Sequence, residues 1–579
     1  MAAAVATGSG PAVGDPGLRR DVGFMGLMWA SEGSIIGSGW LLGALVATEY
    51  AGPAAVFAWV IGSFIVMILA LVHAELGGMF PVAGGTARFP HYAYGSLAGF
   101  AFGWYSWLQA AAVAPIEVEA VMTYAASYEH WMTNPTTGVL TGWGIILGVV
   151  LMAVFVLINF LGIRLLSLIN TYATWWKVIV PVFALVVLFI ARFHGGNFTA
   201  QGGFAPFGLK GVLEATAAGG VVFALLGFEQ AVQIGAESSN PQRDIPRAVI
   251  GAMIIGIVVY MLLQLVFIGA LTSGDLAHGW PAVGANFTSH VTGPYAGLAT
   301  GVGLGWLATI LYIDAIISPS GTGLVYFTAT SRISYGLSRN GYIPTFFEKL
   351  TQSTGVPWGS LIVAFLAGCA FLAPFPSWQS MVGLITSASV LMYAGAPLAF
   401  GALRLSLPDY VRPFRLAGGA IIAPISFVGA NLIIYWSGWN VDWKLFCLIA
   451  LGFAILWASM TFGNNPNKPK LDWASAVWLW PYLVGMALIS YLGQFNEGAD
   501  SAGRPYGLFK TLNNYHIPFY WDIGVIAVFS LVIYYWAISL RMPAEKVKEY
   551  TSVVTYDPQT PGSGPPPVHP HVTEPGFGA

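Results

Sequence analysis

The chain has 579 residues, of which 56% are hydrophobic and 8% charged, and its mean hydropathy is +0.70. Soluble globular proteins carry about 25% charged residues, so this composition excludes a large water-soluble enzyme domain and predicts an integral membrane protein. The 23 basic and 25 acidic residues nearly balance, which gives no reason to expect a nucleic-acid partner. The two cysteines, Cys369 and Cys447, are too few for a disulfide framework or a metal cluster.

In chain order, residues 1–23 are rich in Gly, Ala and Pro and contain the basic pair Arg19 and Arg20, so we expect a cytoplasmic tail and not a cleaved signal peptide. Fourteen apolar runs follow, each about long enough to cross a membrane as a helix. They lie at 24–48, 53–80, 96–126, 141–163, 168–193, 215–237, 247–272, 296–335, 358–375, 379–404, 419–437, 442–463, 473–493 and 518–541. The last segment, 542–579, is expected to be a disordered cytoplasmic tail.

The distribution of basic residues predicts the orientation of these helices, because Lys and Arg concentrate in cytoplasmic loops. With the N-terminus inside, seventeen of the 23 basic residues fall in the tails and loops of the cytoplasmic side. Five fall outside, namely Arg192, Lys210, Lys444, Arg504 and Lys510, and Lys177 lies within the fifth run. We therefore expect a multi-pass protein of the cell (inner or plasma) membrane with both termini in the cytoplasm.

The runs divide into two halves of similar length, about 24–194 and 215–404, with five runs each. An odd number per half forces opposite orientations, as in inverted-repeat transporters. The first run of each half has glycines at mid-span, from Gly33 to Gly39 and from Gly219 to Gly227. Glycine is a poor helix former, so we expect both helices to unwind there. Bare backbone groups are tolerated in a bilayer only where they face protein, water or ligand.

Two interpretations of these glycines remain open. Gly33 and Gly37, four residues apart, fit a small-residue packing face between helices. Alternatively, free N–H groups at the start of a half-helix bind an anionic carboxylate, and the break in the sixth run offers carbonyl groups to an ammonium. The candidate binding residues are Ser34, Ile35, Ile36, Gly37, Ser38, Gly39, Phe223, Ala224, Leu225, Leu226 and Gly227.

The first of these segments, Gly-Ser-Ile-Ile-Gly-Ser-Gly at 33–39, resembles the helix break of the amino acid-polyamine-organocation superfamily. Residues 223–229 and 235–248 are similar to the superfamily's sixth-helix signature, and 81–85 and 331–344 match further motifs. The resemblance covers about 24–405. It implies an all-α, LeuT-like five-plus-five inverted repeat with discontinuous helices one and six, and secondary transport of amino acids or related amines. Four accessory helices follow at 406–541, two more spans than the commonest twelve-helix pattern.

Within the superfamily, two stretches look closest to the aspartate-proton symporter branch. One is Gly-Ser-Gly-Trp at 37–40, and the other is residues 313–319. An acidic substrate requires a cationic anchor, and apart from Lys177 the core helices offer none. That weighs against aspartate as the cargo.

Lys177 is expensive in a membrane, since an ammonium at the bilayer centre costs roughly 2.5–3.5 kcal/mol on insertion scales. One interpretation is that its side chain snorkels to the cytoplasmic face. The resemblance implies another, because this lysine matches one that lies beside the first-helix break in related transporters, where sodium-coupled relatives hold an ion. Lys177 is then the coupling proton site or a fixed cationic substitute for sodium.

Acidic residues within apolar runs are functional candidates because each is costly to bury. They are Glu32, Glu117, Glu119, Glu229 and Asp314. We expect Glu117 and Asp314 to act with Lys177 in proton coupling, with Asp314 pairing either Lys177 or a substrate ammonium. Glu117 and Glu119 point to nearly opposite sides of one helix, whereas Glu229 is expected to cap unwound backbone. Glu237 and Asp244 are expected to form a structural or gating network with Arg243 and Arg247.

The expected function is therefore that of a non-enzymatic secondary active transporter. It imports an amino acid by alternating access, driven by the proton motive force without a cofactor or metal, and its partners are a small-molecule substrate and the lipid bilayer. A polyamine or cationic-amine importer or exchanger is the first alternative, favoured electrostatically by Glu117 and Asp314. A transporter-like nutrient sensor is a more distant one. A channel is disfavoured because no filter-like repeat is visible.

Overall fold

The computed structural model describes residues 22–82, 84–134, 138–161, 163–286, 293–352, 354–372, 377–495 and 517–552. Within these ranges the chain is helical, apart from turns and three isolated β-bridges. The predicted all-α class is therefore confirmed. Almost all of the tail expected at 1–23 lies outside the described residues.

The helices follow the apolar runs, because in a bilayer a helix satisfies its own backbone groups. The first half contains α1 Phe24–Ile35, α2 Ser38–Ala51, α3 Ala55–Met79, α4 Gly85–Tyr94, α5 Ser96–Ala125, α6 Gly142–Phe160 and α7 Ile163–Ala191. The second contains α8 Gly208–Ala217, α9 Val221–Ala224, α10 Glu229–Gln233, α11 Pro241–Ala270, α12 Val283–Asn286, α13 Pro294–Gly301, α14 Gly305–Arg339, α15 Trp358–Leu372 and α16 Trp378–Ser406. The chain continues with α17 Gly419–Ser437, α18 Trp439–Phe462, α19 Trp473–Ala476, α20 Leu479–Leu492, α21 Trp521–Ser539 and α22 Ala544–Ser552.

All fourteen predicted runs coincide with one or more of these helices. Among the described residues, ten segments are long and apolar enough to cross a membrane, and one of them, Ser38–Met79, contains both α2 and α3. Helix α15 is apolar but has only 15 residues. The protein is thus a multi-span membrane protein.

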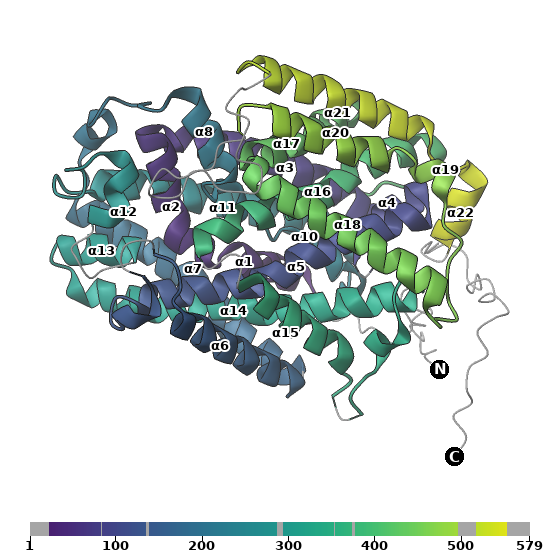
Figure 1. Ribbon diagram of the computed structural model, residues 1–579, viewed down its shortest axis with the longest axis horizontal. Coiled ribbons are helices and arrows are strands. Elements are labelled where there is room, and N and C mark those ends of the chain that lie inside the picture. The colour runs from purple at the N-terminus through teal and green to yellow at the C-terminus, as the bar shows by residue number, and fades with distance from the viewer. Residues whose placement is uncertain are drawn as a thin grey trace, which may run out of the picture.

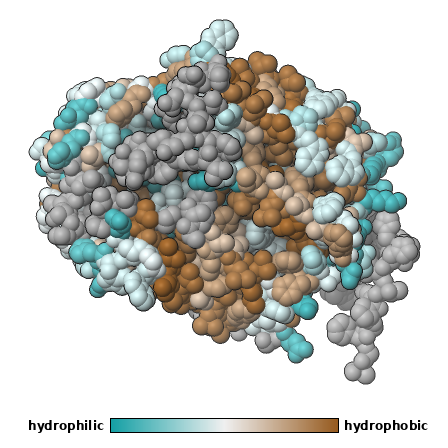
Figure 2. Space-filling view, viewed as in Figure 1, coloured by the Kyte–Doolittle hydropathy of each residue, from teal (hydrophilic) through white to brown (hydrophobic). Residues whose placement is uncertain are grey.

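Helices α1 and α10 contact each other in the middle of the molecule (Figure 1). Figure 1 shows α17, α20 and α21 along the upper edge and α6 and α15 along the lower edge. The outer helices expose large apolar side chains, among them Leu157, Phe189, Trp457, Val484 and Val528. Figure 2 shows a brown band of hydrophobic residues between two more hydrophilic ends. This is the surface that a bilayer covers.

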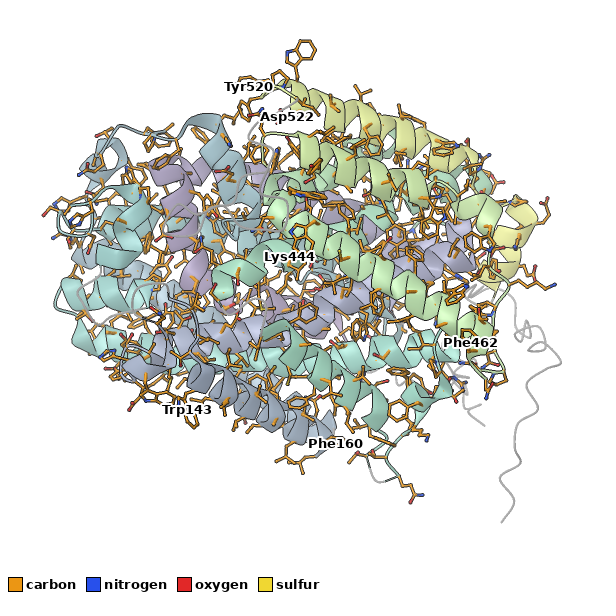
Figure 3. The ribbon with its side chains drawn as sticks, in the orientation of Figure 1. Trp143, Phe160, Lys444, Phe462, Tyr520 and Asp522 are labelled. Carbon is orange, nitrogen blue, oxygen red and sulfur yellow. The ribbon has the colours of Figure 1, made fainter. Side chains whose placement is uncertain are left out.

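Aromatic residues mark the ends of several outer helices. Trp143 and Phe160 lie at opposite ends of α6, Phe462 ends α18, and Tyr520 immediately precedes α21 (Figure 3). Trp143, Phe462 and Tyr520 are exposed. Aromatic rings of this kind are enriched where the membrane meets water, which agrees with helices that span from end to end of the apolar band.

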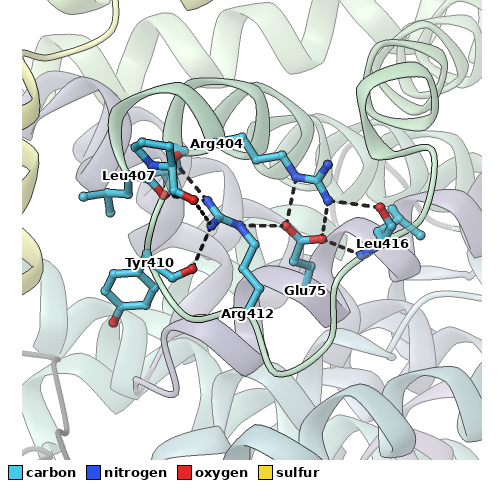
Figure 4. Close-up of polar contacts among 8 residues, drawn as sticks. Glu75, Arg404, Leu407, Tyr410, Arg412 and Leu416 are labelled. Carbon is cyan, nitrogen blue, oxygen red and sulfur yellow. Dashed lines mark hydrogen bonds and ion pairs between the residues drawn. The ribbon is translucent and has the colours of Figure 1, made fainter.

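Glu75, in the last turns of α3, binds two arginines from distant parts of the chain (Figure 4). Arg404 of α16 makes a bidentate contact with its carboxylate at 2.7 and 3.1 Å, and Arg412 approaches at 3.4 Å. The backbone N–H of Leu416 also donates to it at 2.6 Å. Glu75 is fully buried, so these charge-assisted bonds hold the loop between α16 and α17 against the end of α3.

Helix α22 lies in the segment 542–579 that was expected to be disordered. It is docked, because Met542 donates its N–H to the carbonyl of Ala93 at 3.0 Å and Lys546 forms an ion pair with Asp472. The expectation is therefore wrong for α22, since a charged segment with little apolar content is ordered by contacts with α4 and the loop before α19. Residues 553–579 lie outside the described part of the chain.

Candidate functional site

The first apolar run unwinds where its glycines predicted. Helix α1 ends at Ile35 and α2 begins at Ser38. Between them, Ile36 has φ −89° and ψ 89°, and Gly37 has φ −124° and ψ −138°, which are not helical values. The predicted interruption of the first helix is confirmed.

The sixth run is also interrupted, over a longer stretch. Helices α8, α9 and α10 are separated by turns at 218–220 and 225–228. Gly220 has φ 86° and Gly227 has φ 124°, both in the region that side chains other than glycine rarely adopt. The second predicted break is confirmed as well.

The two breaks are packed directly against each other. A Cβ atom on Gly39 would lie 2.9 Å from the Cα of Ala224, and one on Gly227 would lie 2.7 Å from the backbone nitrogen of Ile35. Both distances are shorter than real Cβ contacts. The glycines therefore serve two purposes, because they break the helices and let the broken segments approach.

A carboxylate from another helix covers the start of α2. Glu117 of α5 accepts the backbone N–H of Ser38 at 2.8 Å and the Ser38 hydroxyl at 3.1 Å. The indole N–H of Trp378 donates to the same hydroxyl at 2.8 Å. A helix N-terminus presents unpaired N–H groups and a partial positive charge, so it stabilises an anion. The break does bind a carboxylate, and in this structure it is the protein's own.

A cation covers the other side of the first break. The ammonium of Lys177 on α7 donates to the carbonyl of Gly33 at 2.8 Å and to the hydroxyl of Thr322 at 2.6 Å. Lys177 is fully buried, so its side chain does not snorkel to the membrane surface. It points into the first break, at the carbonyl end of α1 where the helix dipole favours positive charge.

Asp314 has other partners than those expected. Its carboxylate accepts the indole N–H of Trp40 at 3.1 Å and the Ser318 hydroxyl at 2.6 Å. Among the described residues no ion pair joins Asp314 to Lys177. The expected ion pair between Asp314 and Lys177 is thus absent from this conformation. Helix α14 places Asp314 against Trp40 of α2, and Thr322, two turns further along α14, binds Lys177 instead.

Glu229 lies immediately after the second break and binds it. Its carboxylate accepts the backbone N–H of Gly227 at 3.0 Å. The hydroxyls of Tyr326 and Tyr393 donate to it at 3.2 and 2.5 Å, and the amide of Gln230 at 3.3 Å. Four donors therefore converge on a fully buried acid, which is the geometry of a cap on unwound backbone.

A small internal cavity of about 20 Å³ lies between the two breaks. Its lining residues are Ser34, Ile35, Gly37, Gly39, Gln109, Val113, Glu117, Phe223, Leu226, Thr322 and Tyr326. The volume has room for about one water molecule, so in this structure the site is closed to a ligand as large as an amino acid. The other predicted binding residues, Ile36, Ser38, Ala224, Leu225 and Gly227, pack behind this lining.

Sequence reasoning missed four of the lining residues, namely Gln109, Val113, Thr322 and Tyr326. Gln109 left a weak signal, as an amide within the apolar run of α5. Thr322 lies eight residues after Asp314, but a threonine in a long helix ordinarily bonds its own backbone. Only the packing of α5 and α14 against the breaks reveals these residues.

The expected network around Glu237 has a different composition. Glu237 lies 3.8 Å from Arg332 of α14, and its carbonyl accepts the N–H of Val22 at 3.0 Å. Arg243 is exposed on the first turn of α11, and within the described ranges it makes no ion pair. The part of Arg243 in this network therefore stays a prediction, and in this structure its side chain is exposed.

Comparison with known sequences adds independent information. An amino acid permease family model matches residues 22–492. The glutamate/serine transporter AimA of Bacillus subtilis is 37% identical over 543 residues, covering 92% of this chain and 96% of that protein. The aspartate-proton symporter of the same organism is 35% identical, covering 91% and 97%. The branched-chain amino acid permease BcaP, also from Bacillus subtilis, is 23% identical, covering 76% and 93%.

Proposed function

Because the chain belongs to the amino acid permease family, we propose that this transporter imports its amino acid together with a proton, by alternating access around the two helix breaks. The observation that carries the proposal is the pair of opposite charges at the first break, Glu117 at the start of α2 and Lys177 at the end of α1. The name of one relative, an aspartate-proton symporter, supports the same coupling.

We further propose that residues 24–405 form a LeuT-like five-plus-five inverted repeat, followed by four accessory spans at 406–541. Both termini then face the cytoplasm of the cell that carries the protein in its inner or plasma membrane. Five apolar runs in each half and the bias of basic residues toward one side support this arrangement.

Coupling follows from competition for the start of α2. A substrate carboxylate needs the N–H and hydroxyl groups of Ser38, which Glu117 occupies in the closed structure. Two carboxylates at one site repel each other, so Glu117 leaves or takes up a proton when the substrate binds. Each proton that enters along a potential of 100 mV supplies about 2.3 kcal/mol for accumulation.

Lys177 has one of two roles in this cycle. As a coupling site it releases its proton when water reaches it, and as a fixed cation it holds the carbonyl end of α1 throughout. In both cases its bond to Gly33 links α7 to the break. Asp314 contributes to the same buried charge distribution from α14, and Glu229 and Glu237 support the breaks and their cytoplasmic end.

The proposed cargo is a zwitterionic amino acid. The names of the two relatives that are 37% and 35% identical mention glutamate, serine and aspartate. A polyamine or other cationic amine is the second candidate, because the acid Glu117 lines the cavity and attracts a cation. Uptake competition separates the candidates, and binding without flux identifies a nutrient sensor instead.

Purified protein in proteoliposomes tests the proposal. With an inward proton gradient, the wild type is expected to accumulate labelled L-serine or L-glutamate, and unlabelled putrescine is expected not to compete. Lys177→Ala and Glu117→Gln are expected to lose gradient-driven accumulation. Lys210→Ala and Glu129→Gln, which alter side chains away from the breaks, serve as matched controls. Unchanged proton-driven accumulation in Lys177→Ala and Glu117→Gln overturns the assignment of the coupling residues.

A further inference from the structure

Gln109 of α5 is buried at the cavity, and neither of its two N–H donors has a partner among the described residues. It is 1% exposed and lines the cavity between the breaks. Its Oε1 accepts the hydroxyl of Ser389 on α16 at 3.2 Å. Its Nε2, which carries two N–H donors, has no hydrogen-bond partner among the described residues.

An unmet donor of this kind is uncommon in protein interiors, and each instance needs a specific physical reason. The same cavity contains a second unmet group, the hydroxyl of Ser34, which is 6% exposed. By contrast, the charged lining residue Glu117 already accepts two donors from Ser38. Among the described side chains that line the cavity, the polar groups without a partner are therefore an amide N–H₂ and a hydroxyl.

The position of Gln109 relates it to one end of a bound amino acid. Gln109 precedes Glu117 by eight residues, a rise of about 12 Å along α5. A ligand carboxylate at Ser38 lies at the Glu117 end of the cavity. The rest of such a ligand would extend toward Gln109, between the apolar side chains of Val113, Phe223 and Leu226 that line the cavity.

We propose that Gln109 selects the substrate by its side chain, and that Nε2 donates to an oxygen on the β, γ or δ carbon. The substrate class is then L-amino acids with a short hydroxyl- or carboxylate-bearing side chain, which rests on the proposed function of amino acid import. Ser389 of α16 is a positioning residue. Its hydroxyl donates to Oε1 of Gln109, which leaves Nε2 of the same amide to face the cavity.

The chemistry favours discrimination against apolar substrates. A substrate that lacks the oxygen leaves the buried N–H₂ unpaired, and sites built around a hydrogen bond reject such analogues strongly. A neutral donor amide also accepts serine and the acidic amino acids alike, since both present an oxygen acceptor. The apolar wall limits the side chain to a short one.

Counterflow exchange in proteoliposomes tests this inference without a proton gradient. Vesicles are loaded with unlabelled L-serine, and the entry of labelled L-serine and labelled L-alanine is compared. The wild type is expected to prefer serine by about 10-fold or more, the effect of one hydrogen bond to a buried group. Gln109→Leu is expected to reduce that ratio to near one while alanine entry continues.

Gel filtration and thermal unfolding show whether Gln109→Leu folds. If it does not fold, three further variants still test the role of Gln109. Ser389→Ala is expected to lower the serine-to-alanine ratio by less than Gln109→Leu. Gln109→Glu, which removes both donors and adds a charge, is expected to abolish competition by L-aspartate. Val113→Ala is the matched control, because it alters an apolar lining residue and is expected to change both substrates alike.

The outcomes separate this inference from the proposed function. A wild type that exchanges amino acids without preferring serine over alanine overturns the role of Gln109 and leaves amino acid transport intact. An unchanged ratio in folded Gln109→Leu or Gln109→Glu does the same. Absence of any amino acid exchange by the folded wild type instead overturns the proposed function.

Discussion

The two helix breaks satisfy their bare backbone groups in different ways. At the first break, the charged partners come from other helices, Glu117 from α5 and Lys177 from α7. At the second, the acid that binds Gly227 is Glu229, two residues along the same chain segment. The first break therefore depends on how helices are placed relative to one another, whereas the second carries its own cap.

This difference assigns distinct mechanical roles to the breaks. Any movement of α1 and α2 relative to α5 and α7 would change the bonds to Glu117 and Lys177. Glu229 moves with α10, and the hydroxyls of Tyr326 and Tyr393 hold it. We infer that the second break is the fixed side of the site and that the first is the adjustable side.

The largest expected effect comes from filling the contact between the breaks. Gly227→Ala forces a side chain onto φ 124° and into contact with the backbone of Ile35. Strain and overpacking together are expected to cost about 2–6 kcal/mol. Thermal unfolding and uptake assays are expected to show loss of both folded protein and transport. Gly336→Ala is the control, because this helical glycine of α14 has open space around it. Equal stability and transport of the two variants would contradict the close packing of the two breaks.

The next largest effect separates the two acids that bind the breaks. Glu229→Gln weakens bonds from four donors and is expected to lower stability by about 1–3 kcal/mol, with the pH dependence of uptake retained. Glu117→Gln removes a charge that accepts only two hydrogen bonds among the described residues, both from Ser38. Its unfolding temperature is therefore expected to fall less than that of Glu229→Gln. Thermal unfolding in detergent ranks the two variants. A larger loss of stability in Glu117→Gln reverses the assignment of fixed and adjustable sides.

Glu32 provides an effect of opposite sign. It lies on α1 four residues before the break, is fully buried, and has no hydrogen-bond partner for either carboxyl oxygen among the described residues. Burying an unpaired polar group costs about 1–3 kcal/mol in protein mutational series. Glu32→Met is therefore expected to raise the unfolding temperature. A lowered temperature shows instead that the carboxyl group stabilises the closed state.

The sequence was sufficient to predict the position of both breaks, because glycines clustered at one depth of an apolar run weaken the helix there. It also located Lys177, since a lone lysine in a long apolar run is conspicuous. It did not predict the partners of these groups. The contacts of Glu117 with Ser38 and of Lys177 with Thr322 join residues 79 and 145 positions apart, and only tertiary packing brings them together.

Other features were missed because their residues look ordinary in one dimension. Glu75 lies near the end of an apolar run, where an acid is expected to be solvated, yet it is buried against two arginines. Helix α22 has the composition of a surface segment, and its order depends on contacts with α4 and Asp472. Polarity along a chain predicts exposure poorly wherever a distant charge compensates it.

The smallest expected effect concerns this last contact, far from both breaks. Burial alone raises the pKa of Asp472, but hydrogen bonds from Lys546 and Ser96 hold it below its ordinary value of 3.8. A depressed carboxyl pKa contributes stability that is complete above the unfolded pKa and is lost as the pH falls through the folded value. The docking of α22 is therefore expected to be full at neutral pH and to weaken below about pH 4.

The pair is partly exposed, with 42% of the Lys546 side chain accessible, so Lys546→Ala is expected to cost no more than about 1 kcal/mol. A spin-label distance between α22 and α4, followed with increasing salt, is expected to lengthen more readily in this variant than in the wild type. Lys548→Ala, at an exposed position further along the same helix, is the matched control. If both variants behave alike, the backbone bond from Met542 to Ala93 holds α22 without the ion pair.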